Sequence, residues 1–142
     1  MAYSTNSDVT DEFKSIDTSG LISTAKIDEW ISQDDEYIDG RIGLLYETPV
    51  TAVKSLKIVK QISIGLVAQR IAFILETKSI TPKGDQAIPK NLITEAKERL
   101  QMIVDRKLLL SDATERSTHA GVKSFTSDNV VARKFDLNVN QW

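Results

Sequence analysis

The stretch VKSLKIVKQISIGLVAQRIAFIL, residues 53–75, decides the fold of this chain. Its apolar residues cover more than one face of a helix, which a half-exposed helix would not tolerate, so we expect a helix at the centre of the core. Many of them are β-branched and would also suit strands, but no turn interrupts the run and its length favours a helix. Lys54, Lys57, Lys60 and Arg70 punctuate the run and argue against a transmembrane span.

Two helices are expected before this stretch. Ser7 can cap a short one, with acidic residues near the positive end of the helix dipole. Ser23 or Thr24 can start a longer amphipathic helix, whose apolar residues recur at three- and four-residue steps and which ends near Gly40 or Gly43.

One more helix is expected after a loop at residues 81–85, running from about Lys90 to Lys107. Beyond it polar and single apolar residues alternate without a sustained period, which predicts an extended arm that cannot build its own core. The expected fold is therefore mainly α, a small helical bundle of about four helices over residues 1–109, followed by an extended C-terminal arm over residues 110–142.

The arm carries isolated side chains that suggest a docking role. Large apolar groups are costly to leave in water, so a partner surface is a reasonable place for them. The predicted partner-binding residues are Phe125, Val131, Arg133, Phe135, Leu137 and Trp142. The alternative is a disordered tail in which Trp142 lies at a frayed end.

Length and composition indicate one ordinary soluble domain. A chain of 142 residues suits a single core, and 41% hydrophobic with 27% charged residues is close to the average for globular domains. The absence of cysteine excludes disulfides and thiolate metal sites. The first residues lack the pattern of a secretory signal, and no uninterrupted apolar span follows, so we expect a cytoplasmic protein, or one assembled in a cytoplasm, and no membrane partner.

Charge is unevenly distributed along the chain. Residues 1–40 contain ten acidic residues against Lys14 and Lys26, whereas residues 41–142 contain sixteen basic residues against ten acidic ones. An acidic face of one copy can therefore meet a basic face of the next, although two solvated faces without partners would give the same count.

No catalytic constellation is evident. His119 is the only histidine, so no pair of histidines with metal-ligand spacing exists. Asp34, Asp35, Glu36 and Asp39 can bind a hard cation or act as an acid–base pair, but a solvated helix face is the expected role. We therefore expect a protein that is not an enzyme and uses no cofactor or metal.

Lys54, Lys57 and Lys60 lie three apart on one edge of the long helix and can meet nucleic-acid phosphates. The residues between them are aliphatic rather than aromatic, and the whole chain is mildly acidic. A small helical nucleic-acid-binding or regulatory protein is therefore an alternative function.

The order of elements resembles the head–tail adaptor (connector, head-completion) proteins of tailed phages, over roughly residues 2–108. The pieces that carry the resemblance are Tyr3-Ser4-Thr5, the acidic helix from Asp8 to Phe13, Ile27, the run Tyr37-Ile38-Asp39-Gly40-Arg41, Pro49-Val50, the apolar helix with Leu56, Ile62 and Arg70, and Ala96-x-x-x-Leu100. The chain departs from the family where residues 42–46 replace a proline-rich turn.

The resemblance implies a structural protein of the virion, at the head–tail junction. Such adaptors form a homo-oligomeric ring, commonly of twelve copies, that docks on the portal protein through the C-terminal arm and offers its other face to a stopper or tail-completion protein. DNA would at most pass through the ring. Another neck or tail-completion protein of the same virion is a further alternative.

Overall fold

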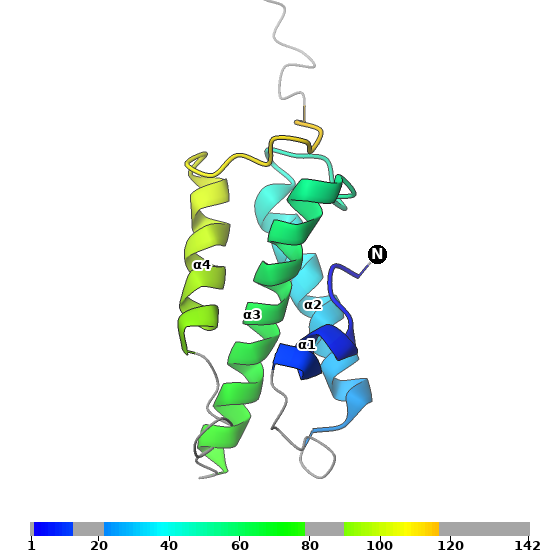
Figure 1. Cartoon of the computed structure of the whole chain (residues 1–142), viewed down its shortest axis with the longest axis vertical. Coiled ribbons are helices and arrows are strands. Elements are labelled where there is room, and N and C mark those ends of the chain that lie inside the picture. The colour runs from blue at the N-terminus through cyan, green and yellow to red at the C-terminus, as the bar shows by residue number, and fades with distance from the viewer. Residues whose placement is uncertain (1, 13–21, 79–89, 117–142) are drawn as a thin grey trace, which may run out of the picture.

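A computed structural model describes residues 2–12, 22–78 and 90–116. Within these ranges the helices are α1 (Asn6–Glu12), α2 (Thr24–Ile42), α3 (Val53–Thr77) and α4 (Lys90–Val104). The long helix α3 contacts α1, α2 and α4, and the three longer helices run roughly along the same axis (Figure 1). The small, mainly α bundle predicted from the sequence is therefore confirmed.

The ends of α2 follow the predicted capping signals. Ser23 is the N-cap, and its hydroxyl accepts a hydrogen bond from the Lys26 backbone N–H at 3.3 Å. Gly43 is the C-cap, and its N–H donates to the Asp39 carbonyl at 2.8 Å. Gly40 lies inside the helix, so of the two expected endpoints it is the later glycine that ends α2.

Two other predicted boundaries are wrong by a few residues. Ser7 lies inside α1, and the cap is instead formed by Thr5, whose hydroxyl accepts from the Asp8 N–H at 3.3 Å while the Asp8 carboxylate accepts from the Thr5 N–H at 2.9 Å. The helix α4 ends before Lys107, because Arg106 adopts the left-handed conformation at φ 58°.

Two buried apolar clusters follow one another along α3. The first contains Tyr3, Ile38, Ile42, Tyr46, Val50, Val59, Ile62, Leu66, Leu100, Ile103 and Leu110, and the second contains Val9, Ile22, Ile27, Trp30, Ile31, Ile64, Val67, Ala68, Ile71 and Leu75. By length and composition α3 could cross a membrane, but 56% of its most apolar window is buried inside the bundle, as in a core helix. The central position predicted for this helix is confirmed, while Phe73 and Val53 remain exposed on its surface.

The chain after α4 turns back over one end of the bundle. Leu110 is buried, and its N–H donates to the Tyr46 hydroxyl at 3.2 Å. The backbones of Thr114 and Arg116 then pair with the α2–α3 loop, at 2.8 Å in each hydrogen bond. Residues 110–116, which the sequence assigned to the arm, thus lie against the helices, and the rest of the predicted arm, residues 117–142, lies outside the described residues.

This returning segment also completes the start of α3. Ala52 is the N-cap and provides no side-chain hydrogen bond. The Asp112 carboxylate caps the helix instead. It accepts hydrogen bonds from the Lys54 N–H at 2.7 Å, from the Ser55 N–H at 2.9 Å and from the Ser55 hydroxyl. The hydrogen bond from Ser55 lowers the pKa of Asp112 below its ordinary value.

Candidate interaction surface

The partner-binding residues predicted from the sequence all lie outside the described residues. They are Phe125, Val131, Arg133, Phe135, Leu137 and Trp142. The structure does place the last described residue, Arg116, at the end of the bundle that carries the α2–α3 loop (Figure 1), where its guanidinium donates to the Gly43 carbonyl at 2.9 Å. The predicted docking role of the arm stays a prediction.

The expectation that the acidic cluster of α2 is a solvated face is wrong for Asp34. This residue is 5% exposed, because its position on the apolar stripe turns it toward α3. Arg70 of α3 neutralises it, with guanidinium–carboxylate distances of 2.6, 3.0 and 3.1 Å. Burial raises the pKa of Asp34, and the hydrogen bonds from Arg70 oppose that rise.

The same expectation is wrong for Asp35, which is also 5% exposed. Its carboxylate accepts from the Ser63 hydroxyl at 2.6 Å and from the Tyr3 backbone N–H at 2.7 Å. Burial raises the pKa of Asp35, against the lowering effect of these two hydrogen bonds. Ser4 adds a 2.8 Å hydrogen bond to Ser63, so the N-terminal segment is fastened to both α2 and α3. Asp35 therefore has a structural role.

Tyr3 extends this network to the α2–α3 connection, close to the start of α3. Its hydroxyl donates to the Asp39 carboxylate and accepts from the buried Val50 N–H at 2.9 Å. Burial is the main cause of a strongly raised pKa of the Tyr3 hydroxyl. Of the acidic cluster, Glu36 is the residue that is exposed, as predicted.

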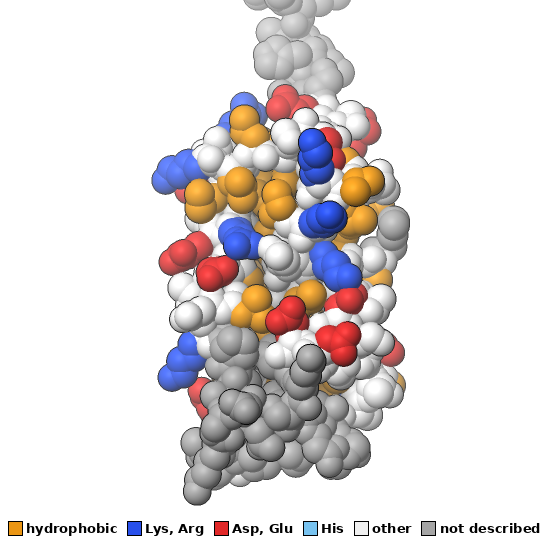
Figure 2. Space-filling model, in the orientation of Figure 1, with side chains coloured by type: hydrophobic (Ala, Val, Ile, Leu, Met, Phe, Trp, Pro, Cys, Tyr) orange, Lys and Arg blue, Asp and Glu red, His pale blue; other side chains and the backbone are white. Residues whose placement is uncertain are grey.

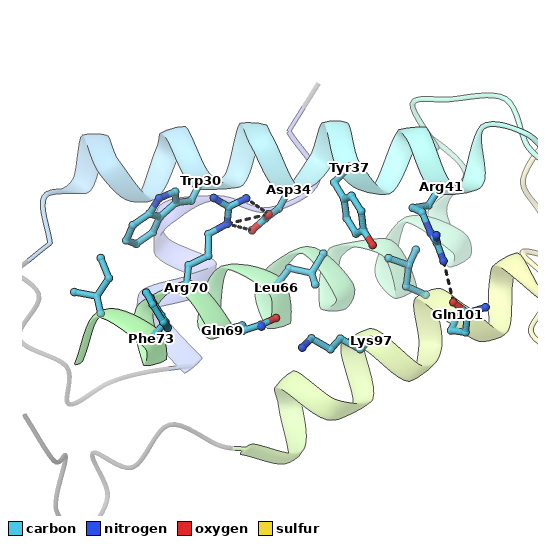
Figure 3. A pocket seen from close by; sticks show the side chains of 12 residues that line it. Trp30, Asp34, Tyr37, Arg41, Leu66, Gln69, Arg70, Phe73, Lys97 and Gln101 are labelled. Carbon is cyan, nitrogen blue, oxygen red and sulfur yellow. Dashed lines mark hydrogen bonds and ion pairs between the residues drawn. The ribbon is translucent and has the colours of Figure 1, made fainter. Parts of the chain in front are cut away.

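An open groove of about 780 Å³ runs between α2 and α4, over the surface of α3 (Figure 3). Aromatic and basic side chains make up half of its lining. Its lining residues are Trp30, Asp34, Tyr37, Arg41, Leu66, Gln69, Arg70, Phe73, Ile74, Lys97, Leu100 and Gln101. Tyr37 is 52% and Phe73 68% exposed, and the Arg41 guanidinium reaches across to the Gln101 amide oxygen at 2.9 Å. This groove was not predicted from the sequence, because it forms only where α2 and α4 pack on α3.

A second hollow, of about 440 Å³, lies along the other edge of α2, beside the N-terminal segment. Its lining residues are Ala2, Ser4, Thr5, Asn6, Asp28, Ile31, Ser32, Asp35, Glu36 and Asp39. Four carboxylates and no basic side chain are among them, so this hollow is acidic. The helix α2 thus separates a basic, aromatic groove from an acidic edge.

The lysine edge expected on α3 is present, but one of its members is paired. Lys54 and Lys57 are exposed, whereas the Lys60 ammonium lies 2.7 Å from the Asp8 carboxylate. The hydrogen bond from Lys60 holds the pKa of Asp8 below its ordinary value. Figure 2 shows basic side chains in a row over the upper part of α3, with acidic ones below them.

Two further findings concern metal binding and similarity to known proteins. Among the described residues, no three His, Cys, Asp or Glu side chains come together in a way that would hold a metal ion. Comparison of the chain with protein-family models, with curated proteins and with solved structures finds no match in any of the three.

Proposed function

We propose that this chain is a structural head–tail connector (adaptor) of a tailed phage. It assembles as a homo-oligomeric ring beneath the portal protein, with its C-terminal arm on the portal and its other face toward a stopper or tail-completion protein. The proposal rests on the resemblance in sequence and on how the residues that carry it are arranged.

The observation that carries the proposal is that segments which carry the resemblance, and which lie far apart in the sequence, contact one another in the fold. Tyr3, from the first piece, hydrogen-bonds both Asp39 of the Tyr37–Arg41 run and Val50 beyond the turn. Ala96 of the last piece lies against α3 at Gly65. Residues that combine to hold one bundle together are the kind expected to recur in a family with one fold.

The described end of the chain also fits the proposal. Residues 110–116 are held to the bundle by the Asp112 cap and by backbone hydrogen bonds, so residues 117 onward start from a fixed point on one end of the molecule. A tether of this kind favours docking of an arm on a neighbour, because the anchored end raises the effective concentration of the rest.

Binding to a purified portal ring tests the proposal. The full chain is expected to occupy the ring in a defined number of copies, and the double variant Phe125→Ala/Phe135→Ala is expected to lose that occupancy. Val53→Ala, which trims an exposed side chain of the bundle, serves as the matched control and should bind like the wild type. Unchanged binding of the double variant would remove the role assigned to the arm.

The second candidate is a small helical nucleic-acid-binding or regulatory protein. The exposure of Lys54 and Lys57 on one edge of α3 favours it. Duplex DNA binding that weakens steeply with salt, and that Lys54→Gln/Lys57→Gln reduces, is the expected result under this alternative. No binding at low salt would eliminate it. Another neck or tail-completion protein would share the assembly behaviour and differ in its neighbours.

A further inference from the structure

The groove between α2 and α4 combines exposed aromatic surface with positive charge. Tyr37 and Phe73 expose more than half of their surface there, which is unusual for large apolar side chains inside a concave site. Trp30 lies buried at one end of the groove, and Lys97 lines the α4 side (Figure 3). Concave surfaces that mix aromatic and basic groups suit a partner that is both apolar and acidic.

The net charge of the groove follows from its internal pairing. Asp34 is the only acidic side chain among the lining residues, and Arg70 neutralises it. Arg41 and Lys97 are left to give the groove its positive charge; within the described part of the chain, neither is in an ion pair. The occupant must therefore bring carboxylates.

The acidic edge of α2 provides such a surface. Asp28, Ser32 and Glu36 follow one another at four-residue steps and so lie on one line along the helix, about 12 Å from first to last. Asp28 and Glu36 are exposed and have no ion-pair partner among the residues the structure describes. Ile31, which belongs to the buried core, lies at the base of the same hollow.

We propose that the groove of one copy receives the acidic edge of α2 from a second copy of this chain. The two surfaces lie on opposite edges of the same helix and so cannot meet within one chain. Between copies they form a heterologous, head-to-tail contact, which repeats and closes into a ring when the rotation allows. This inference deepens the proposed function. It rests on that function only in taking the repeated contact to close into a ring.

Charge reversal with complementation tests this interface. A groove variant, Arg41→Glu/Lys97→Glu, and an edge variant, Asp28→Lys/Glu36→Lys, each place like charges at the contact. Each variant alone is expected to self-associate more weakly, with a dissociation constant raised by at least about tenfold in sedimentation velocity. Mixing the two makes every contact complementary again, because the acidic groove meets the basic edge and the native groove meets the native edge. Recovery in the mixture is the expected result.

Two controls separate the interface from general effects. Lys54→Glu/Lys57→Glu changes the net charge as much as the groove variant does, but on the α3 edge, and should associate like the wild type. Far-UV circular dichroism checks that every variant keeps its helices. Equal loss in this control, or no recovery when the groove and edge variants are mixed, would overturn the proposal.

Disulfide trapping detects the contact even where association is weak, because the chain has no cysteine of its own. A mixture of Glu36→Cys and Lys97→Cys chains should yield the mixed dimer in preference to either symmetric dimer. Replacing the second by Lys57→Cys should abolish that preference. Portal binding is measured separately on the same proteins: trapping without portal binding would refute the adaptor and leave the interface standing, while portal binding without preferential trapping would refute the interface.

Discussion

At Gly65 the backbone of α3 lies close against α4, and Gly65→Ala tests that packing. A Cβ atom at this position would lie 2.4 Å from the Ala96 Cβ and 2.9 Å from the Leu92 carbonyl oxygen. Carbon atoms in contact are about 3.5–4.0 Å apart, so α4 would have to shift by more than 1 Å. Neither neighbour is the flexible end of a long side chain, and the strain therefore falls on the two helices.

The magnitude follows from two opposing effects. Overpacking a core by one methyl group costs about 1–3 kcal/mol, and contact with a Cβ and a backbone carbonyl places this case near 3 kcal/mol. Alanine is favoured over glycine in a helix by about 1 kcal/mol. We expect Gly65→Ala to lower the free energy of unfolding by about 2 kcal/mol, which corresponds to a fall in melting temperature of about 8 °C.

Gly40→Ala is the matched control. Gly40 lies within α2, and an added Cβ would meet nothing within 4 Å, so helix propensity acts there without strain. Gly40→Ala should raise the free energy of unfolding by about 0.5–1 kcal/mol. Urea denaturation followed by far-UV circular dichroism measures both changes. If Gly65→Ala were as stable as the wild type, the close α3–α4 approach described here would be wrong.

The remaining predictions concern the polar contacts. Burial raises the pKa of Asp35 in the folded state, so the stability that this residue contributes is present at low pH and is lost as pH rises through the raised pKa. Relative to the wild type, Asp35→Asn should therefore gain stability from acid to neutral pH, as measured by thermal denaturation across pH. The pKa of Asp112 is lowered, so the stability that this residue contributes depends on pH in the opposite way. The loss of stability in Asp112→Ala should be largest at neutral pH and should shrink as pH falls through the lowered pKa, as measured by thermal denaturation across pH. Tyr3→Phe leaves the buried Val50 N–H without its acceptor and should cost about 1–3 kcal/mol in urea denaturation, against a change within about 0.5 kcal/mol for the exposed Tyr37→Phe.

The helices were predictable because their signals are local. Ser23 precedes the apolar periodicity of α2 and caps it, and the apolar run of residues 53–75 is long enough to identify the central helix. The α1 cap was misplaced because Ser7 and Thr5 are both good capping residues, and the reciprocal contact of Thr5 with Asp8 decides between them.

Whether the carboxylates of the acidic cluster are buried depends on residues that lie far away in the sequence. Asp34 lies among the buried apolar residues of α2, but its partner Arg70 lies 36 residues further on. Asp35 is buried by contacts with Tyr3 and Ser63, 32 and 28 residues away. Local pattern alone favours solvation for such carboxylates, because burial becomes favourable only when the partners are brought together by the fold.

The candidate surface shows the same division between local and long-range information. Tyr37 and Arg41 are four residues apart, so the sequence places them on one face of α2. That this face lies across a groove from Lys97 depends on the packing of α2 and α4 on α3. The Asp112 cap depends likewise on a contact across 57–58 residues, and no local signal predicts it.

Native mass spectrometry of the full chain, alone and mixed with a purified portal ring, tests the central claim most directly. The account predicts a complex in which each portal ring carries a defined and multiple number of copies, and loss of that complex in Phe125→Ala/Phe135→Ala. A chain that binds no portal, while it binds duplex DNA in a salt-sensitive way through Lys54 and Lys57, would contradict the adaptor and favour the nucleic-acid-binding alternative.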